Sequence, residues 1–249
     1  MPSGGGGVVS VLVPPPGTPG AETTLTAYFN HGVDTGGQSF GACVFDPDGA
    51  ILTQSGVVGA PAPRPGVVTV TAKGFTESIT PACDGTYATG STSETIEPGS
   101  LVTFGFGDQK TAGSGDDFPT SFPGVPAPHF VTLASTDRLT AASPKVSRAS
   151  DLGVDWTVSG TPLSLESVVV LWTQKSATLT CTFDASAGTG VVPADALLQL
   201  DKGSASFAVQ SVHEADDGNP DEGGWGIRLL VQMPASTPTG LAVGSATLE

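Results

Sequence analysis

The chain has 249 residues, of which 24 are acidic and 9 are basic, so its net charge at pH 7 is −15. Such a charge repels nucleic-acid phosphates and anionic lipids, and nucleic acid is therefore excluded as the expected partner. Hydrophobic residues make up 38% of the chain, which is enough to build a packed core and argues against an extended disordered protein.

Glycine and proline are unusually frequent, with 34 and 21 copies. Proline breaks helices and glycine is a poor helix former, whereas the abundant valine and threonine favour strands. This composition predicts short strands joined by many turns. The expected fold class is all-β, with two tandem β-sandwich domains of the immunoglobulin-like (Ig-like) or jelly-roll type and one short helix in the second domain.

The first part of the chain contains runs that are apolar or that alternate between apolar and polar residues, as strands do. We expect strands at residues 8–13, 23–29, 40–45, 67–71, 78–80, 101–106 and 129–133. Turn sequences separate several of them, including Asp46-Pro-Asp-Gly49 and Glu97-Pro-Gly-Ser100. These strands predict an N-terminal β-sandwich domain that covers residues 8–135.

The second part begins after a stretch, residues 134–150, that has few large apolar side chains. Strands are expected at residues 152–158, 167–172, 178–183, 204–212, 226–233 and 241–248. The densest apolar block lies at 167–183, where Gln174-Lys-Ser176 is the turn of a predicted central hairpin. One helix is predicted within 192–200, because Pro193 suits the first turn of a helix.

The residues at both ends of the sequence are expected to lie outside these domains. Residues 1–7 read as a flexible tether after an artificial start, and Leu248-Glu249 looks like the remnant of a cloning site. The C-terminal domain, which is Ig-like, therefore covers residues 136–247. A Ser/Gly tether commonly follows the lipidated cysteine of bacterial lipoproteins. We expect a secreted protein or a lipoprotein of the outer membrane or cell surface, anchored by lipid only if the full-length protein carries a lipobox.

Three cysteines are present, Cys43, Cys83 and Cys181. Cys43 and Cys83 lie in the same predicted domain, and a disulfide between them would suit an oxidising compartment. Cys181 would then remain as a free thiol inside an apolar strand, where it packs as a small hydrophobic residue. The alternative is a cytosolic protein with three free thiols, which the composition does not favour.

One segment, Gly37-Gln-Ser-Phe-Gly41, fits the G-x-S-x-G pattern of serine hydrolases. That motif exposes its serine between a strand and a helix, but the residues after Ser39 predict a strand. A glycine turn is therefore the preferred interpretation, and a hydrolase that uses Ser39 is kept as an alternative. His31, His129 and His213 have no metal-ligand spacing, and surface or loop positions are expected for them. No catalytic residue is assigned.

An acidic stretch between residues 213 and 224 is the candidate for a binding site. Calcium prefers oxygen ligands, and such side chains are supplied here by Asp216, Asp217, Asn219, Asp221 and Glu222. Trp225 follows them, and an exposed tryptophan beside calcium ligands would suit the stacking of a sugar ring. The alternative is a solvated hairpin loop, in which like charges cost little. Apart from this candidate calcium ion, no cofactor is predicted.

Several segments share a pattern with other proteins. In the second part they are Arg148-Ala-Ser-Asp-Leu-Gly-Val-Asp-Trp-Thr157, Val168-Val-Val-Leu171 and Thr180-Cys-Thr-Phe-Asp-Ala-Ser-Ala-Gly-Thr-Gly-Val-Val-Pro193. In the first part they are Gly66-Val-Val-Thr-Val-Thr71 and Gly85-Thr-Tyr87. These segments resemble uncharacterised surface lipoproteins of large-genome gliding bacteria, such as myxobacteria. The resemblance covers most of the chain. It implies a β-sandwich on the cell surface and no assigned activity.

From these observations we expect a non-enzymatic extracellular or cell-surface β-sandwich protein that serves in adhesion, recognition or envelope structure. Its partner would be a surface protein or a polysaccharide. The alternatives are a calcium-dependent or carbohydrate-binding module that uses residues 213–225, and the hydrolase that uses Ser39.

Overall fold

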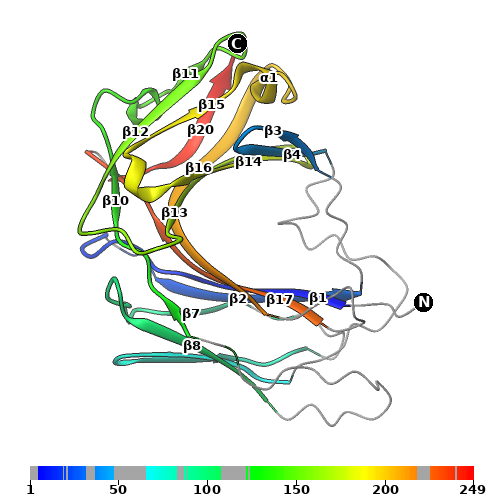
Figure 1. Ribbon diagram of the computed structural model, residues 1–249, viewed down its shortest axis with the longest axis vertical. Helices are drawn as coiled ribbons and strands as arrows, with labels where there is room; N and C mark the ends of the chain where they lie inside the picture. Colours follow the sequence, from blue (N-terminus) through cyan, green and yellow to red (C-terminus); the bar gives the residue numbers. More distant parts are fainter. Residues whose placement is uncertain are drawn as a thin grey trace. The chain divides into compact units, whose positions relative to one another are not determined.

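Strands make up most of the regular structure in the computed structural model of this chain (Figure 1). The described residues are 5–18, 20, 22–31, 37–47, 66–82, 87, 89–107, 122, 124–217, 225–238 and 240–249. In this part of the chain one α-helix and two short 3-10 helices accompany the strands, so the predicted all-β class is confirmed. None of these helices is long and apolar enough to cross a membrane.

The chain forms two units, and each unit is assembled from three separate segments. Unit 1 comprises Met1–Asp34, Gln54–Ala127 and His213–Gln232, and unit 2 comprises Thr35–Thr53, Pro128–Val212 and Met233–Glu249. The expectation of two consecutive domains, 8–135 and 136–247, is therefore corrected. The physical reason is strand pairing. An early strand, β4 (Cys43–Asp46), pairs with a late one, β14 (Ala177–Asp184), and so belongs to the later sheet.

One sheet of unit 1 has the strand order β17–β1–β2–β7. Its strands are β1 (Gly5–Leu12), β2 (Thr23–His31), β7 (Gly90–Thr92) and β17 (Trp225–Pro234). β1 lies between a parallel partner, β17, and an antiparallel partner, β2. Val9 and Val11 of β1 are fully buried, as expected for an apolar strand inside a sheet.

The other sheet of unit 1 has the strand order β6–β5–β8–β9. Its strands are β5 (Val68–Ala72), β6 (Phe75–Ile79), β8 (Leu101–Phe106) and β9 (Val125–Pro126). Alternate residues point into the core, as Val102, Phe104 and Phe106 of β8 do. The rings of Phe29 in β2 and Phe106 lie 6.1 Å apart in an edge-to-face arrangement, so aromatic packing joins the two sheets.

The predicted tether at residues 1–7 is wrong for its last three residues. Gly5–Gly7 belong to β1 and pair with β2 on one side and with β17 on the other. Gly7 lies under the ring of Phe29, and a Cβ atom at this position would collide with that ring. Close packing, and not flexibility, therefore requires glycine at position 7.

The larger sheet of unit 2 contains β3, β4, β14, β13, β16, β20 and β11 in that order. The strands not yet located are β3 (Gln38–Phe40), β11 (Lys145–Val146), β13 (Ser167–Gln174), β16 (Gly203–Asp217) and β20 (Val243–Leu248). The predicted central hairpin is confirmed, because β13 pairs with β14 across a turn formed by Lys175 and Ser176. Trp172 of β13 is fully buried at the centre of this sheet.

The second sheet of unit 2 has the strand order β15–β12–β10–β18–β19. Its strands are β10 (Val131–Leu133), β12 (Leu152–Val158), β15 (Thr189–Val192), β18 (Ser236–Thr237) and β19 (Gly240–Leu241). β12 is the strand predicted at residues 152–158, and its residues Leu152, Val154 and Trp156 are buried in alternation. The Trp156 ring lies 6.1 Å from the ring of Phe183 in β14, so the two sheets share one core.

The helix predicted within residues 192–200 is confirmed as α1 (Ala194–Leu197), with Pro193 at its N-cap. Two 3-10 helices, η1 (Arg138–Thr140) and η2 (Ala185–Ala187), lie in connections between strands. Leu197 is fully buried in the core of unit 2. α1 thus covers the core of its unit.

The last two residues, which were expected to lie outside the domains, are part of the fold of unit 2. Leu248 is buried and pairs with Gly203 of β16 and Val146 of β11. The Glu249 N–H donates to the Val146 carbonyl, and the Glu249 carbonyl accepts from the Arg148 N–H. Both residues therefore contribute to the pairing between β11, β20 and β16.

Candidate functional site

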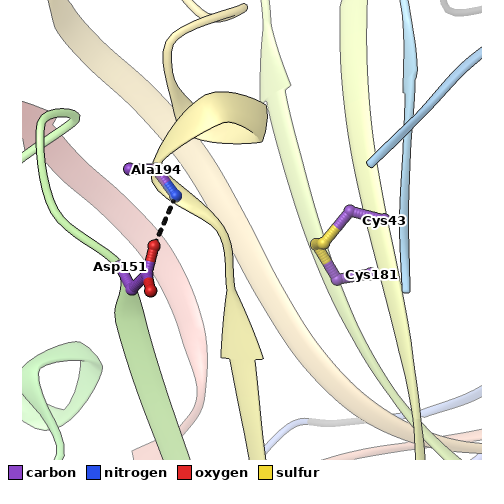
Figure 2. Close-up of a disulfide and its surroundings, with 4 residues drawn as sticks. All are labelled: Cys43, Asp151, Cys181 and Ala194. Atoms are coloured by element: carbon purple, nitrogen blue, oxygen red, sulfur yellow. Dashed lines mark hydrogen bonds between the residues drawn. A yellow bond between two sulfur atoms is a disulfide. The ribbon is translucent and has the colours of Figure 1, made fainter. Parts of the chain in front are cut away.

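A disulfide bond joins Cys43 of β4 to Cys181 of β14 (Figure 2). The two residues stand directly opposite each other on antiparallel strands, and both side chains are fully buried. The Thr182 N–H donates to the Ala42 carbonyl, so the cysteines occupy a pair that exchanges no backbone hydrogen bonds. Such pairs bring antiparallel strands closest together, and the Cα atoms are 4.0 Å apart here.

The predicted bridge between Cys43 and Cys83 is wrong, because Cys43 is bonded to Cys181. The expectation that Cys181 is a free buried thiol is wrong for the same reason. Proximity in the sequence favoured Cys83, whereas the pairing of β4 with β14 places Cys43 beside a residue 138 positions away. Cys83 itself lies outside the described residues.

Figure 2 also shows how α1 is held in place. The Asp151 carboxylate accepts a hydrogen bond of 2.8 Å from the backbone N–H of Ala194 at the start of the helix. The Arg148 guanidinium donates to the carbonyls of Leu197 and Leu198 at its end, over 3.3 and 2.8 Å. The contacts that Arg148 and Asp151 make here are structural, because both hold the backbone of α1 at its ends.

Ser39 does not occupy a nucleophile elbow. It is an exposed residue in the middle of β3, a strand at the edge of its sheet, where it pairs with Val44 of β4. The turn at Gly41 and Ala42 leads into another strand and not into a helix. The strand–turn–helix geometry that exposes a catalytic serine is therefore not formed, and this arrangement does not support the hydrolase alternative.

The expectation of surface or loop histidines is wrong for His213. His213 lies in β16 and is buried. His129 precedes β10, and its side chain is 17% exposed. His31 lies in β2. The spacing of the histidines along the sequence did not indicate the buried position of His213.

His129 is held by a completely buried carboxylate, that of Glu166. Glu166 Oε2 lies 2.9 Å from His129 Nδ1 and also accepts from the Leu163 N–H at 2.9 Å. Glu166 Oε1 accepts from the backbone N–H of His129 at 2.9 Å. A buried carboxylate needs such donors to compensate for its lost hydration. Sequence reasoning missed this pair, because nothing in the local pattern distinguishes Glu166 from a solvated acid.

The same carboxylate stiffens the turn Leu163–Glu166. The Glu166 N–H donates to the Leu163 carbonyl at 3.2 Å, which closes the turn. Leu165 has a φ angle of 68°, in the left-handed region. Its place in the turn is that of the third residue of a type II turn, where glycine is usual. The Leu165 side chain is nevertheless 80% exposed, so an apolar group is presented on a strained backbone.

A second buried carboxylate, that of Asp137, has a structural role. One oxygen caps η1 by accepting from the Leu139 N–H at 2.8 Å, and the other accepts from the Asp155 N–H at 3.0 Å. Burial raises the pKa of the Asp137 carboxyl above its usual value, because desolvation penalises the charged form. The two hydrogen bonds oppose this rise without cancelling it.

The candidate calcium site falls largely outside the described residues. Asp216 and Asp217 belong to the extended end of β16, so the first part of the expected acidic loop is a strand. The other candidate ligands are not described: Asn219, Asp221 and Glu222. The calcium site therefore stays a prediction. In the described part of the chain, no group of three or more His, Cys, Asp or Glu residues is arranged to hold a metal ion.

Comparisons with known proteins do not assign the chain to a family. No protein-family model and no curated protein matches the sequence. One solved structure that matches is described as "Structural insight into host cell surface retention of a 1.5-MDa bacterial ice-binding adhesin". The likeness covers 94% of this chain and 66% of that chain, at 13% sequence identity and a TM-score of 0.20. A TM-score this low does not establish a shared fold, and the chain is therefore similar to that adhesin only in a distant sense.

Proposed function

We propose that this protein works outside the cytoplasm, secreted or at a cell surface, as a non-enzymatic β-sandwich protein in adhesion, recognition or envelope structure. The observation that carries the proposal is the Cys43–Cys181 disulfide. Disulfides form and persist in oxidising compartments and are rare in the cytosol. Both sulfur-bearing side chains are fully buried, which protects the bond from attack by external thiols.

The position of Ser39 argues against the hydrolase alternative. Ser39, the residue with the strongest resemblance to a catalytic motif, lies in a strand at the edge of its sheet. A calcium-dependent role rests on the sequence of residues 216–222 alone, and no contact among the described residues favours it.

The compartment is tested by counting thiols. The chain has three cysteines, and two of them form the bridge. Protein isolated from its natural cells without reductant, then denatured and labelled with a maleimide, is therefore expected to show one reactive thiol, that of Cys83. Labelling after reduction should show three. Three reactive thiols before reduction would mean a reducing compartment and would overturn the proposal.

The role at the surface is tested separately on intact cells. Antibodies raised against the folded protein should label cells that have not been permeabilised, and protease added outside should remove that label. Beads coated with the protein are expected to attach to such cells or to their matrix, whereas beads coated with heat-denatured protein should not. Labelling that appears only after permeabilisation would contradict an extracellular role.

A further inference from the structure

The outer face of the β6–β5–β8–β9 sheet in unit 1 is rich in hydroxyl groups. Val68, Val70 and Phe104 point into the core, and the residues that alternate with them point away from it. The outward residues that matter here are Thr69, Thr71, Thr76, Ser78, Leu101 and Thr103. These six residues are called the hydroxyl face below. All of them are exposed except Thr69, which is half-buried.

The hydroxyl groups are arranged in rows across the strands. Thr76, Thr71 and Thr103 stand opposite one another on β6, β5 and β8 and form one row. Ser78 and Thr69 form a second row on β6 and β5. Neighbouring strands lie about 4.8 Å apart, so the hydroxyls recur at a regular spacing set by the sheet itself.

Hydrogen bonds within the protein fix these side chains in place. The Thr69 and Ser78 hydroxyls lie 2.9 Å apart, and the Thr103 hydroxyl donates to the Thr71 carbonyl at 3.2 Å. The Thr76 hydroxyl donates to the Phe75 carbonyl at 2.8 Å. A hydroxyl oxygen can accept further hydrogen bonds when its proton is engaged. β-branched threonine also has few rotamers, so little conformational entropy remains to be lost when a ligand binds.

The hydroxyl face carries no charge, although the chain as a whole has a net charge of −15. At the turn between β5 and β6, the Lys73 ammonium lies 3.7 Å from the Glu97 carboxylate, so these two charges compensate each other. A neutral surface on an acidic protein gives no Coulombic attraction to an anion or a cation. The ligand chemistry that it matches is therefore neutral.

We propose that the hydroxyl face binds an extended neutral polysaccharide, an inference that rests on the extracellular role proposed above. Sugar hydroxyls both donate and accept hydrogen bonds, as Thr and Ser hydroxyls do. The threonine methyl groups and Leu101, which is 57% exposed, offer apolar contact to the C–H faces of sugar rings. An open sheet face suits an extended chain better than a small molecule, because small ligands are bound in concave pockets.

Charge argues against a second copy of this chain as the occupant. Two chains with a net charge of −15 each repel one another, and no charge on the hydroxyl face offsets that repulsion. Self-association through this face is therefore treated as a competing outcome in the experiment. A polymer that binds by neutral contacts is expected to remain bound in about 0.5 M NaCl, where electrostatic interactions are screened.

The test uses the full chain and insoluble polymers. Insoluble cellulose, mannan and chitin serve as neutral probes, with carboxymethylated cellulose as the charged control. We expect retention on at least one neutral polymer, unchanged by about 0.5 M NaCl. If cellulose is the polymer bound, retention on its carboxymethylated form should be weaker, because both partners are then negative.

Variants test whether the polymer binds at the hydroxyl face. The triple variant Thr71→Val/Thr76→Val/Thr103→Val removes one row of hydroxyls and keeps the side-chain shape and the strand preference. It should retain the wild-type melting temperature and bind at least about tenfold more weakly, as expected for the loss of several hydrogen bonds. The matched control is Thr157→Val/Thr182→Val, which changes exposed threonines in strands of unit 2. This control should bind like the wild type.

Three results would overturn the inference. They are no retention on any neutral polymer, equal binding by the folded triple variant, and a dimer in sedimentation experiments that the triple variant abolishes. The last result would assign the face to self-association. Surface labelling of intact cells is independent of these measurements, so failure of the inference can be told apart from failure of the proposed function.

Discussion

The imidazole Nδ1 of His129 and the carboxylate Oε2 of Glu166 lie 2.9 Å apart, and the Glu166 side chain has no exposed surface. The same carboxylate accepts hydrogen bonds from the backbone N–H groups of His129 and Leu163. Glu166 therefore connects the segment before β10 to the turn before β13, two parts of unit 2 that are 37 residues apart in the chain.

Replacing Glu166 is expected to destabilise the protein strongly. Glu166→Ala leaves two backbone N–H groups and the His129 ring without their buried acceptor, and we expect a loss of about 2–4 kcal/mol in the free energy of unfolding. Urea unfolding at neutral pH measures this loss. The control is Glu97→Gln, which breaks an exposed ion pair with Lys73 and should change stability by less than about 1 kcal/mol. Similar losses in the two variants would contradict a role for the buried carboxylate.

Replacing Leu165 with glycine is expected to stabilise the protein. The left-handed backbone at φ 68° costs a leucine about 1–2 kcal/mol, whereas glycine adopts it freely. The greater entropy of glycine in the unfolded chain offsets part of this gain, so Leu165→Gly should raise the free energy of unfolding by up to about 1 kcal/mol. In the matched control, Leu101→Gly removes an exposed leucine from a regular strand and should instead lower stability. If the melting temperature falls in both variants, the proposed backbone strain at Leu165 is contradicted.

The bridge between Cys43 and Cys181 should contribute substantially to stability. It joins residues that are 138 positions apart, and removing a native disulfide costs about 2–5 kcal/mol. The variant Cys43→Ala/Cys181→Ala is expected to unfold at correspondingly lower urea concentration than the oxidised wild type. Cys83→Ser should leave the bridge intact and serves as the control. Peptide mapping that finds Cys43 bonded to Cys83 would contradict the structure.

Asp137 should make the protein less stable as the pH rises. Its pKa in the folded state lies above the ordinary value of 3.8, because burial disfavours the carboxylate. The stabilisation from its protonated form is therefore fully present below that ordinary value and is lost as the pH rises through the raised pKa. Relative to Asp137→Asn, which cannot titrate, the wild type should lose stability as the pH rises above about 4 and through the raised pKa. Urea unfolding across this range measures the difference in the free energy of unfolding between the two proteins. The contributions of the other carboxylates cancel in this difference. A difference that does not vary with pH would refute the raised pKa.

Gly7 and Gly153 should respond in opposite ways to the same substitution. A Cβ at Gly7 meets the ring of Phe29, so Gly7→Val is expected to cost about 1–3 kcal/mol through overpacking. A Cβ at Gly153 in β12 meets open space, and Gly153→Val should be neutral or slightly stabilising, since valine favours strands. Chemical denaturation of both variants makes the comparison. A tolerated valine at position 7 would mean that the first residues are a tether after all.

The candidate site was less predictable than the strands, because polar function depends on surroundings that the local pattern does not contain. Ser39 matched a catalytic spacing, but its backbone is that of a strand at the edge of a sheet. Glu166 showed no signal in the sequence, yet its side chain is completely buried. Thr71 was recognised as part of a strand, and only the register with β6 and β8 shows that it belongs to a row of hydroxyls.

By itself, the sequence determined the class of the protein and many of its strands. The alternation in β8 and β12, the β13–β14 hairpin and the helix after Pro193 follow from local preferences, which act over a few residues. The tertiary structure alone decided that Cys43 bonds with Cys181, that Gly5–Gly7 form a strand and that both units are discontinuous. These features depend on which strands become neighbours and in what register, and strands far apart in the chain are paired by the packing of the whole sheet.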